Sequence, residues 1–405
     1  MNILLFIMLF FIVILLYNKK EYFLFSFLYT TYWFLNILFA EVFFSDYKFS
    51  ELTYVLIIFS CISIFIGELL GTTKINKIEN IKFSKNRLYT FIYVSFLIGL
   101  IFPIESLIIN GIPLSTLVSF QNLLEANNTM AVARYSEDIK TSTLSQITLV
   151  FLYLSPLLAG FTNCKYKSNK IVIISLLPSL LVLLTQNTKL VFIACLLLVL
   201  VGRLTYFIVF KNRFPKISFK LLLKVIVGFF LFYVLMIFTL IARVGKFDED
   251  VVNESNSKIA TYFAHLPALS SWLENYYHGH HELLYGIETF FGIANFLGIE
   301  ERKTGIYQDN YRFISNGIIF ETNVYSVFRF HINDFGFLGC LLFLFFLGFI
   351  FGRAKSSSSS LISVCIIACL IFYTFNSYLS SIWAYVSFIL LFVFFYIFLL
   401  LSKTK

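Results

Sequence analysis

The chain has 405 residues, of which 59% are hydrophobic and 13% are charged, and 52 are phenylalanine. About a quarter of the residues of a typical soluble protein are charged, so this composition excludes a soluble globular protein. The formal net charge of +9 follows from lysines and arginines placed on one side of a membrane, and it does not indicate nucleic-acid binding.

Apolar stretches of about twenty residues, long enough for a helix to cross the hydrocarbon core of a bilayer, follow one another along the chain. They predict about eleven spans, over residues 2–17, 22–44, 53–70, 89–109, 144–162, 170–185, 189–210, 218–242, 334–352, 361–376 and 381–401. We therefore expect an all-α polytopic integral membrane protein, with residues 1–405 in a single multispanning domain.

The charges in the connecting segments predict the topology. Lysines and arginines fill segments such as 74–87, 165–170 and 203–220, where acidic residues are nearly absent. By the positive-inside rule these segments are cytoplasmic, which predicts an external N-terminus and a cytoplasmic C-terminus. Two of the external segments are long, namely 110–143 and 243–333.

The large external loop, 243–333, carries all five histidines of the chain. Within it, residues 259–273 and 283–297 mix aromatic with polar side chains, which predicts two amphipathic helices lying at the membrane surface. We expect this loop to be an ordered lid, because a disordered loop would lack so many aromatic residues.

Four basic residues are predicted at the external face, namely Arg134, Lys189, Arg243 and Arg329. Together they are candidates for binding a diphosphate, since arginine makes paired contacts with phosphate oxygens. The alternative is that each one anchors a helix end at the membrane interface or pairs with a nearby acidic residue.

The densest polar cluster runs from Glu321 to Asp334. If this segment is helical, Glu321, Tyr325 and Arg329 lie four residues apart on one face. Such a carboxylate can take a proton from an attacking hydroxyl, and such a cation can neutralise a departing phosphate. The same spacing also describes an ion pair that only stabilises a helix.

The histidines and cysteines predict no metal site. His265 lies in an apolar stretch, where a lone histidine is more often structural than catalytic. The tract with His278, His280 and His281 resembles a metal-binding sequence in composition, but no third distant ligand is evident. The six cysteines have no metal-type spacing, and no nucleotide-binding motif is present. We therefore expect no cofactor.

Short segments between about residues 120 and 352 carry a resemblance to a known family. They are Ala-Arg-Tyr-Ser at 133–136, Thr-Gln-Asn-Thr-Lys at 185–189, Ile-Ala-Arg-Val-Gly at 241–245, Tyr-Phe-Ala-His-Leu-Pro-Ala at 262–268 with Trp272, Tyr-Gly-Ile-Glu-Thr-Phe-Phe-Gly at 285–292, Glu-Thr-Asn-Val-Tyr-Ser-Val-Phe-Arg at 321–329 and Asp-Phe-Gly at 334–336. In this order, on a chain of this topology, they resemble the Wzy-type oligosaccharide repeat-unit polymerases of bacterial O-antigen and capsule synthesis.

The resemblance implies an enzyme of the bacterial inner membrane. It would transfer the growing glycan from undecaprenyl diphosphate to a new lipid-linked repeat unit at the external face, without metal or nucleotide. The lipid-linked oligosaccharide and membrane lipid are the implied partners, with a flippase and a chain-length regulator of the same pathway. The implied site residues are Arg134, Tyr135, Lys189, Arg243 and Arg329 for the substrate and its diphosphate, Glu321, Asp334 or His265 as the base, and Asn323 and Tyr325 for orienting sugar hydroxyls.

Three other functions remain open at this stage. An O-antigen ligase would share the many spans and the large loop, but would transfer the finished glycan to a lipid core. A flippase or other secondary transporter would show internal repeats and broken helices at the bilayer midplane. A glycosyltransferase that uses single-sugar polyprenyl donors would need an acidic motif in the first external loop, for which Asp46 and Glu51 are the candidates.

Overall fold

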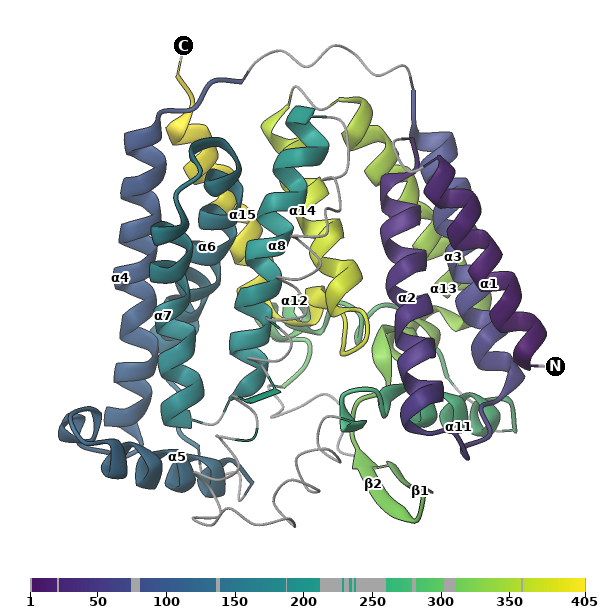
Figure 1. Cartoon of the computed structure of the whole chain (residues 1–405), viewed down its shortest axis with the longest axis horizontal. Helices are drawn as coiled ribbons and strands as arrows, with labels where there is room; N and C mark the ends of the chain where they lie inside the picture. Colours follow the sequence, from purple (N-terminus) through teal and green to yellow (C-terminus); the bar gives the residue numbers. More distant parts are fainter. Residues whose placement is uncertain are drawn as a thin grey trace. The chain divides into compact units, whose positions relative to one another are not determined.

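The computed structural model describes residues 2–19, 22–73, 81–135, 139–186, 188–211, 228, 233, 234, 237, 260–278, 282–301, 311–357 and 360–404. The helices are α1 (Asn2–Asn18), α2 (Leu24–Phe43), α3 (Glu51–Gly71), α4 (Lys85–Ile109), α5 (Phe120–Tyr135), α6 (Thr143–Tyr166), α7 (Asn169–Gln186), α8 (Lys189–Lys211), α11 (His265–His278), α12 (Phe291–Phe296), α13 (Ser326–Ser356), α14 (Leu361–Asn376) and α15 (Val386–Ser402) (Figure 1). Two short 3-10 helices, η1 (Leu114–Leu117) and η2 (Ile382–Ala384), and two strands, β1 (Tyr311–Ser315) and β2 (Ile318–Thr322), complete the described elements.

The predicted helical membrane protein is confirmed in its class. Of the described helices, six are long and apolar enough to cross a membrane, namely α3, α4, α6, α7, α8 and α13. Shorter apolar helices are Leu5–Asn18 within α1, α14 and α15. Each predicted span overlaps a described helix except 218–242, most of which lies outside the described residues.

The chain divides into two compact units. Unit 1 contains Met1–Ile81, Ile208–Phe214 and Ser257–Phe392, and unit 2 contains Lys82–Phe207, Pro215–Asn256 and Val393–Lys405. Unit 1 therefore holds most of the large predicted external loop, and unit 2 holds the first long one.

Helices α3 and α13 pack with their backbones in contact inside unit 1. A Cβ atom on Gly67 would lie 2.0 Å from the carbonyl oxygen of Phe345, and one on Gly348 would lie 2.2 Å from that of Ile64. Glycine recurs four residues later on both helices, at Gly71 and Gly352, so each helix presents a strip without side chains. This small-residue spacing is typical of close helix pairs in membranes.

A buried carboxylate fastens α2 to this helix pair. Glu68 of α3 accepts hydrogen bonds from the backbone N–H of Phe25, at 3.2 Å, and of Ser26, at 2.8 Å. These donors lie in the first turn of α2, where N–H groups have no partner within the helix. The N-cap residue Phe23 makes no side-chain cap bond, so the neighbouring helix supplies the cap.

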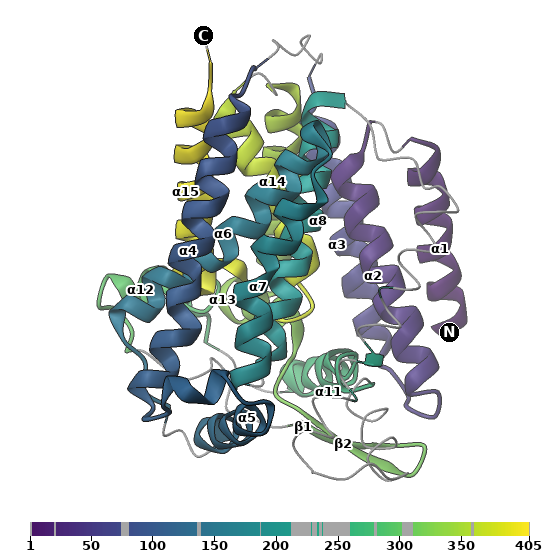
Figure 2. The ribbon, with the colours of Figure 1, turned by 60° about the vertical axis from the view of Figure 1, so that its left-hand side comes forward.

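In unit 2, α5 lies across the ends of α4 and α7 (Figures 1 and 2). The amide of Asn127 joins α5 to α7, because its Nδ2 donates to the carbonyl oxygens of Leu183 and Leu184 at 3.1 and 2.8 Å. The carboxylate of Glu105 in α4 accepts from the hydroxyls of Ser142 and Ser145 at the start of α6. Glu105 therefore secures a helix start.

The two predicted amphipathic helices fare differently. Residues 259–273 overlap α11, which begins at His265. Within 283–297 the only helical part is α12, Phe291–Phe296, so this expectation is wrong for most of the segment. The physical reason is that Tyr285 and Gly286 take left-handed φ values of 52° and 99°, which a helix does not tolerate.

Candidate functional site

Helix α13 is broken at Gly336, within the Asp-Phe-Gly segment. Gly336 has φ 68° and ψ 178°, a combination that only glycine adopts without strain. The carbonyl oxygens of Asn333 and Asp334 accept from the backbone N–H groups of Leu284 and Tyr285, each at 3.0 Å. The first part of α13 is therefore a short helix whose end is held by the 284–289 turn.

The carboxylate of Asp334 holds the same turn from the side. Its two oxygens accept from the backbone N–H of Glu288, at 3.1 Å, and of Thr289, at 2.5 Å. The residue is fully buried. A carboxylate with both oxygens engaged by buried backbone donors fixes the turn, and it is poorly placed to take a proton from a substrate.

His331 links this turn to α14. Its Nδ1 lies 3.0 Å from the Oγ1 of Thr289, and its Nε2 lies 2.9 Å from the hydroxyl of Tyr373. The carbonyl of Thr289 in turn accepts from the hydroxyl of Ser381 at 2.7 Å. His331 has no exposed surface, so both ring nitrogens serve an internal network that positions the first part of α13.

Arg329 lies on this positioned segment, close to two aromatic rings. Its guanidinium carbon is 4.2 Å from the ring centre of Tyr325 and 5.8 Å from that of Trp272. Only 8% of Arg329 is exposed. A cation over the face of an aromatic ring is attracted by the ring quadrupole, more strongly where water is excluded. The predicted proximity of Tyr325 and Arg329 is therefore confirmed. Trp272 of α11 is a second aromatic residue close to Arg329.

Glu321 does not share their helical face, and that expectation is wrong. It lies in strand β2, opposite Arg312 of β1, and its Oε1 is 3.3 Å from the Nε of Arg312. The hairpin forms because Asn316 and Gly317 take φ values of 52° and 75°, the conformation that an Asn-Gly pair favours between two strands. This hairpin was not predicted, and the Asn-Gly pair is the sequence signal that indicates it.

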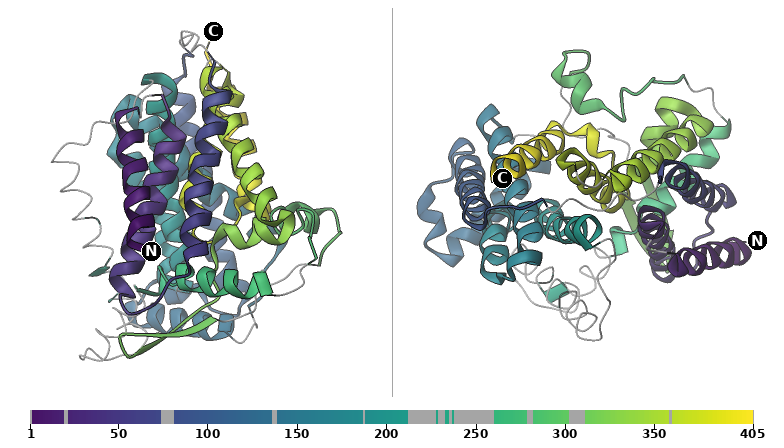
Figure 3. Two further views of the ribbon diagram at one scale, coloured as in Figure 1. Left: turned by 90° about the vertical axis from the view of Figure 1, so that its right-hand side faces the viewer. Right: turned by 90° about the horizontal axis from the view of Figure 1, so that it is seen from above.

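Asp46 anchors this hairpin. Its carboxylate accepts from the hydroxyl of Ser315 and from the backbone N–H of Asn316, the latter at 2.8 Å. The hydrogen bond from Ser315 is the largest cause that lowers the pKa of Asp46 below its ordinary value. Figure 3 shows the hairpin and α11 at the same end of unit 1. Asp46 thus has a structural partner, which weakens the reading of Asp46 and Glu51 as an acidic catalytic motif.

His265 begins α11 and is 1% exposed. Its Nδ1 lies 3.0 Å from the carbonyl oxygen of Tyr262, and its ring packs against Trp33 and Tyr378. Its Nε2 has no hydrogen-bond partner among the residues that the structure describes. Burial lowers the pKa of His265 to about 4, so the imidazole is neutral at pH 7.

This buried imidazole predicts a pH-dependent stability. Between pH 6.5 and pH 4 the unfolded state binds a proton at this position and the folded state does not. The neutral imidazole therefore contributes its full stabilisation above pH 6.5. The free energy of unfolding should fall by about 3 kcal/mol as the pH drops to 4. The free energy of unfolding of the detergent-solubilised wild type and of His265→Gln is measured at pH 7 and at pH 4. The decrease between the two pH values should be about 3 kcal/mol smaller in His265→Gln. An identical loss in both proteins would contradict it.

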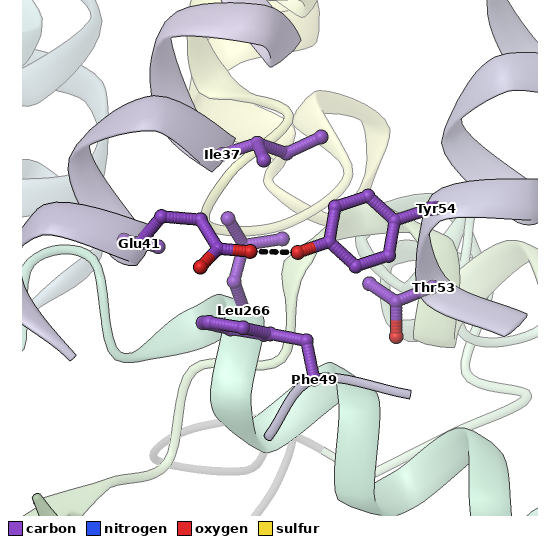
Figure 4. Close-up of a pocket in the computed structure, with 7 residues that line it drawn as sticks. Ile37, Glu41, Phe49, Thr53, Tyr54 and Leu266 are labelled. Atoms are coloured by element: carbon purple, nitrogen blue, oxygen red, sulfur yellow. Dashed lines mark hydrogen bonds between the residues drawn. The ribbon is translucent and has the colours of Figure 1, made fainter. Parts of the chain in front are cut away.

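A small cavity is lined by Leu266 of α11 together with residues of α2, of α3 and of the link between them (Figure 4). The carboxylate of Glu41 accepts from the hydroxyl of Tyr54 there, and the remaining lining residues are Ile37, Ala40, Phe49 and Thr53. Its volume of ≈ 10 Å³ leaves room for about one water molecule, so a sugar does not fit. The sequence signal for Glu41 was a charge inside an apolar run.

The remaining predicted site residues lie elsewhere. Arg134 and Tyr135 end α5 in unit 2, with side chains outside the described part of the chain, and Lys189 begins α8. Arg243, His280 and His281 lie outside the described residues. Asn323 is exposed in the link between β2 and α13. Among the described residues, no group of three or more His, Cys, Asp or Glu side chains is arranged to hold a metal.

Comparison with known protein families, curated protein sequences and solved structures finds no match to this chain. The candidate site therefore rests on its own geometry. It consists of Arg329 close to Tyr325 and Trp272, positioned by the Asp334 and His331 contacts behind it.

Proposed function

We propose that this protein is a polymerase of lipid-linked oligosaccharide repeat units in the bacterial inner membrane. It transfers the growing glycan from undecaprenyl diphosphate to a new lipid-linked repeat unit at the external membrane face. The observation that supports this most is Arg329, a nearly buried cation that lies close to the rings of Tyr325 and Trp272. Aromatic side chains with a few placed polar groups are typical of small-molecule sites, and a fixed cation stabilises charge that develops on a leaving diphosphate.

The reaction needs three roles. A hydroxyl of the acceptor sugar attacks the anomeric carbon of the growing glycan, and the bond from that carbon to the diphosphate oxygen breaks. Arg329 stabilises the departing diphosphate, and a base takes the hydroxyl proton. Since both oxygens of Asp334 accept from backbone donors, Glu321 and the neutral His265 are the remaining candidates for the base. Arg134, Lys189 and Arg243 assist in substrate binding.

The topology of the proposal comes from the charge distribution. Eleven spans, an external N-terminus and a cytoplasmic C-terminus place residues 110–143 and 243–333 outside. Arg329 then lies at the external end of α13, where a polyprenyl diphosphate enters from the lipid.

A secondary transporter is the second candidate, because the break in α13 at Gly336 resembles the discontinuous helices of transporters. In transporters the unwound backbone carbonyls coordinate the transported ion. Here the carbonyls of Asn333 and Asp334 accept from Leu284 and Tyr285. Since those acceptors are already engaged by the chain, the polymerase is the better-supported function.

Deletion of the gene, with lipid-linked and surface glycans profiled together, tests the proposal. A polymerase mutant should carry single repeat units on its surface and no long chains. A ligase mutant would carry no repeat units on the lipid core, and a transporter mutant would accumulate lipid-linked repeats that never reach the surface. Either of these last two profiles would refute the polymerase.

A further inference from the structure

We propose that the basic end of unit 2 binds the headgroup of an anionic phospholipid. This surface is formed by the start of α4, the turn between α6 and α7, the end of α8 and the residues after α15 (Figure 1). Its cations are Lys82, Lys85, Arg87, Lys165, Lys167, Lys170, Arg203 and Lys403. The inference does not depend on the proposed glycan transfer.

Side-chain hydrogen bonds bring these segments together. The hydroxyl of Tyr166 donates to the carbonyl oxygen of Phe83 at 3.0 Å. Arg87 Nη1 donates to the carbonyl oxygen of Leu401, also at 3.0 Å. Arg203 reaches the side chain of Asn163, with 3.2 Å between Nη2 and Oδ1. The cluster is therefore one continuous surface of a single compact unit.

No carboxylate side chain balances this charge within the contributing segments. Residues 82–104, 139–207 and 393–405 contain no aspartate or glutamate. Two ammonium groups lie near the ring of Tyr166, because Lys85 Nζ is 5.8 Å and Lys165 Nζ is 5.2 Å from its centre. Like charges on one surface repel one another, and an anion bound near them would reduce that cost.

The surface below the cations fits a lipid. Along α4, Lys85, Tyr89, Tyr93, Leu97 and Ile101 recur every four residues and so form one ridge that is inclined to the helix axis. Tyr93, Leu97 and Ile101 are 40%, 60% and 40% exposed. A cation, then tyrosines, then exposed apolar side chains follow the order of headgroup, interface and acyl chain in a bilayer. Basic pockets between membrane helices are known to take anionic headgroups, whereas a soluble acidic partner would leave this apolar ridge unexplained.

Lipid binding to the purified full-length protein tests the proposal. The probes are dioleoyl phosphatidylglycerol and the zwitterionic dioleoyl phosphatidylcholine, titrated in detergent micelles. The double variant Lys85→Gln/Lys165→Gln should bind phosphatidylglycerol about 30-fold more weakly than the wild type, since one basic residue near a membrane surface contributes about fivefold. The charge-conserving Lys85→Arg/Lys165→Arg should retain the wild-type affinity.

The matched control is Lys48→Gln/Lys140→Gln, which removes two exposed lysines elsewhere in the chain and should leave phosphatidylglycerol affinity unchanged. Soluble glycerol phosphate should not displace the lipid. Equal phosphatidylglycerol binding by wild type and Lys85→Gln/Lys165→Gln, equal affinity for the two lipids, or an equal loss in the control would overturn the proposal. If the double variant does not fold, Lys85→Gln and Lys165→Gln singly should each weaken binding about fivefold.

Discussion

Replacing Arg329 with alanine is expected to lower glycan polymerisation by about 100- to 1,000-fold, the usual cost of removing one group that stabilises transition-state charge. The substitution removes the cation close to Tyr325 and Trp272. Short glycans should therefore replace long polysaccharide ladders in cells that carry the variant. Arg329→Lys keeps the charge but loses the planar guanidinium, so it should restore only part of the activity.

Arg353→Ala is the matched control, because it removes an exposed arginine near the other end of the same helix, away from Tyr325 and Trp272. Substitutions of exposed residues usually change stability by about 0.5 kcal/mol or less, so its ladders should stay long. Because Arg329 is largely buried, the amount and thermal unfolding of each variant are measured alongside. A well-folded Arg329→Ala protein that makes full-length ladders would remove Arg329 from the site.

The helices were the part of the fold that the sequence predicted best. A helix that spans hydrocarbon must be apolar over its whole length, and this requirement is local to each segment. The hairpin was missed, although the turn signal of Asn316 and Gly317 is equally local. The helical spacing from Glu321 to Arg329 was followed instead, and it is wrong for Glu321. Four-residue spacing describes a helix only where no turn signal precedes it.

The contacts that build the candidate site were beyond prediction from spacing. Trp272 meets Arg329 because α11 packs against α13, and Asp334 meets Thr289, which is 45 positions away in the sequence. Such pairings depend on which helices become neighbours, which the pattern of a single segment does not specify. The sequence therefore named Arg329 and Asp334 as candidates, but only the fold separates the cation of the site from the carboxylate that holds a turn.

Replacing Gly348 with leucine is expected to destabilise unit 1 by about 3 kcal/mol or more, the upper range for overpacking a well-packed interior. The new Cβ would lie 2.2 Å from the carbonyl oxygen of Ile64, which belongs to the backbone of α3 and has no rotamer in which to move aside. The two helices must then separate, which also strains the Glu68 cap on α2. Thermal unfolding and the yield of folded protein in detergent measure this.

Gly348→Ala changes the free energy of unfolding through two contributions of opposite sign. Alanine favours a helix over glycine by about 0.8 to 1.0 kcal/mol, so in a helix without close neighbours the variant would be more stable. Against the α3 backbone its methyl group meets the same oxygen, and the variant should instead be less stable. Leu338→Ala, on the same helix at a position that is 71% exposed, should change stability by no more than about 0.5 kcal/mol. A stabilised Gly348→Ala would mean that α3 and α13 do not touch through their glycines.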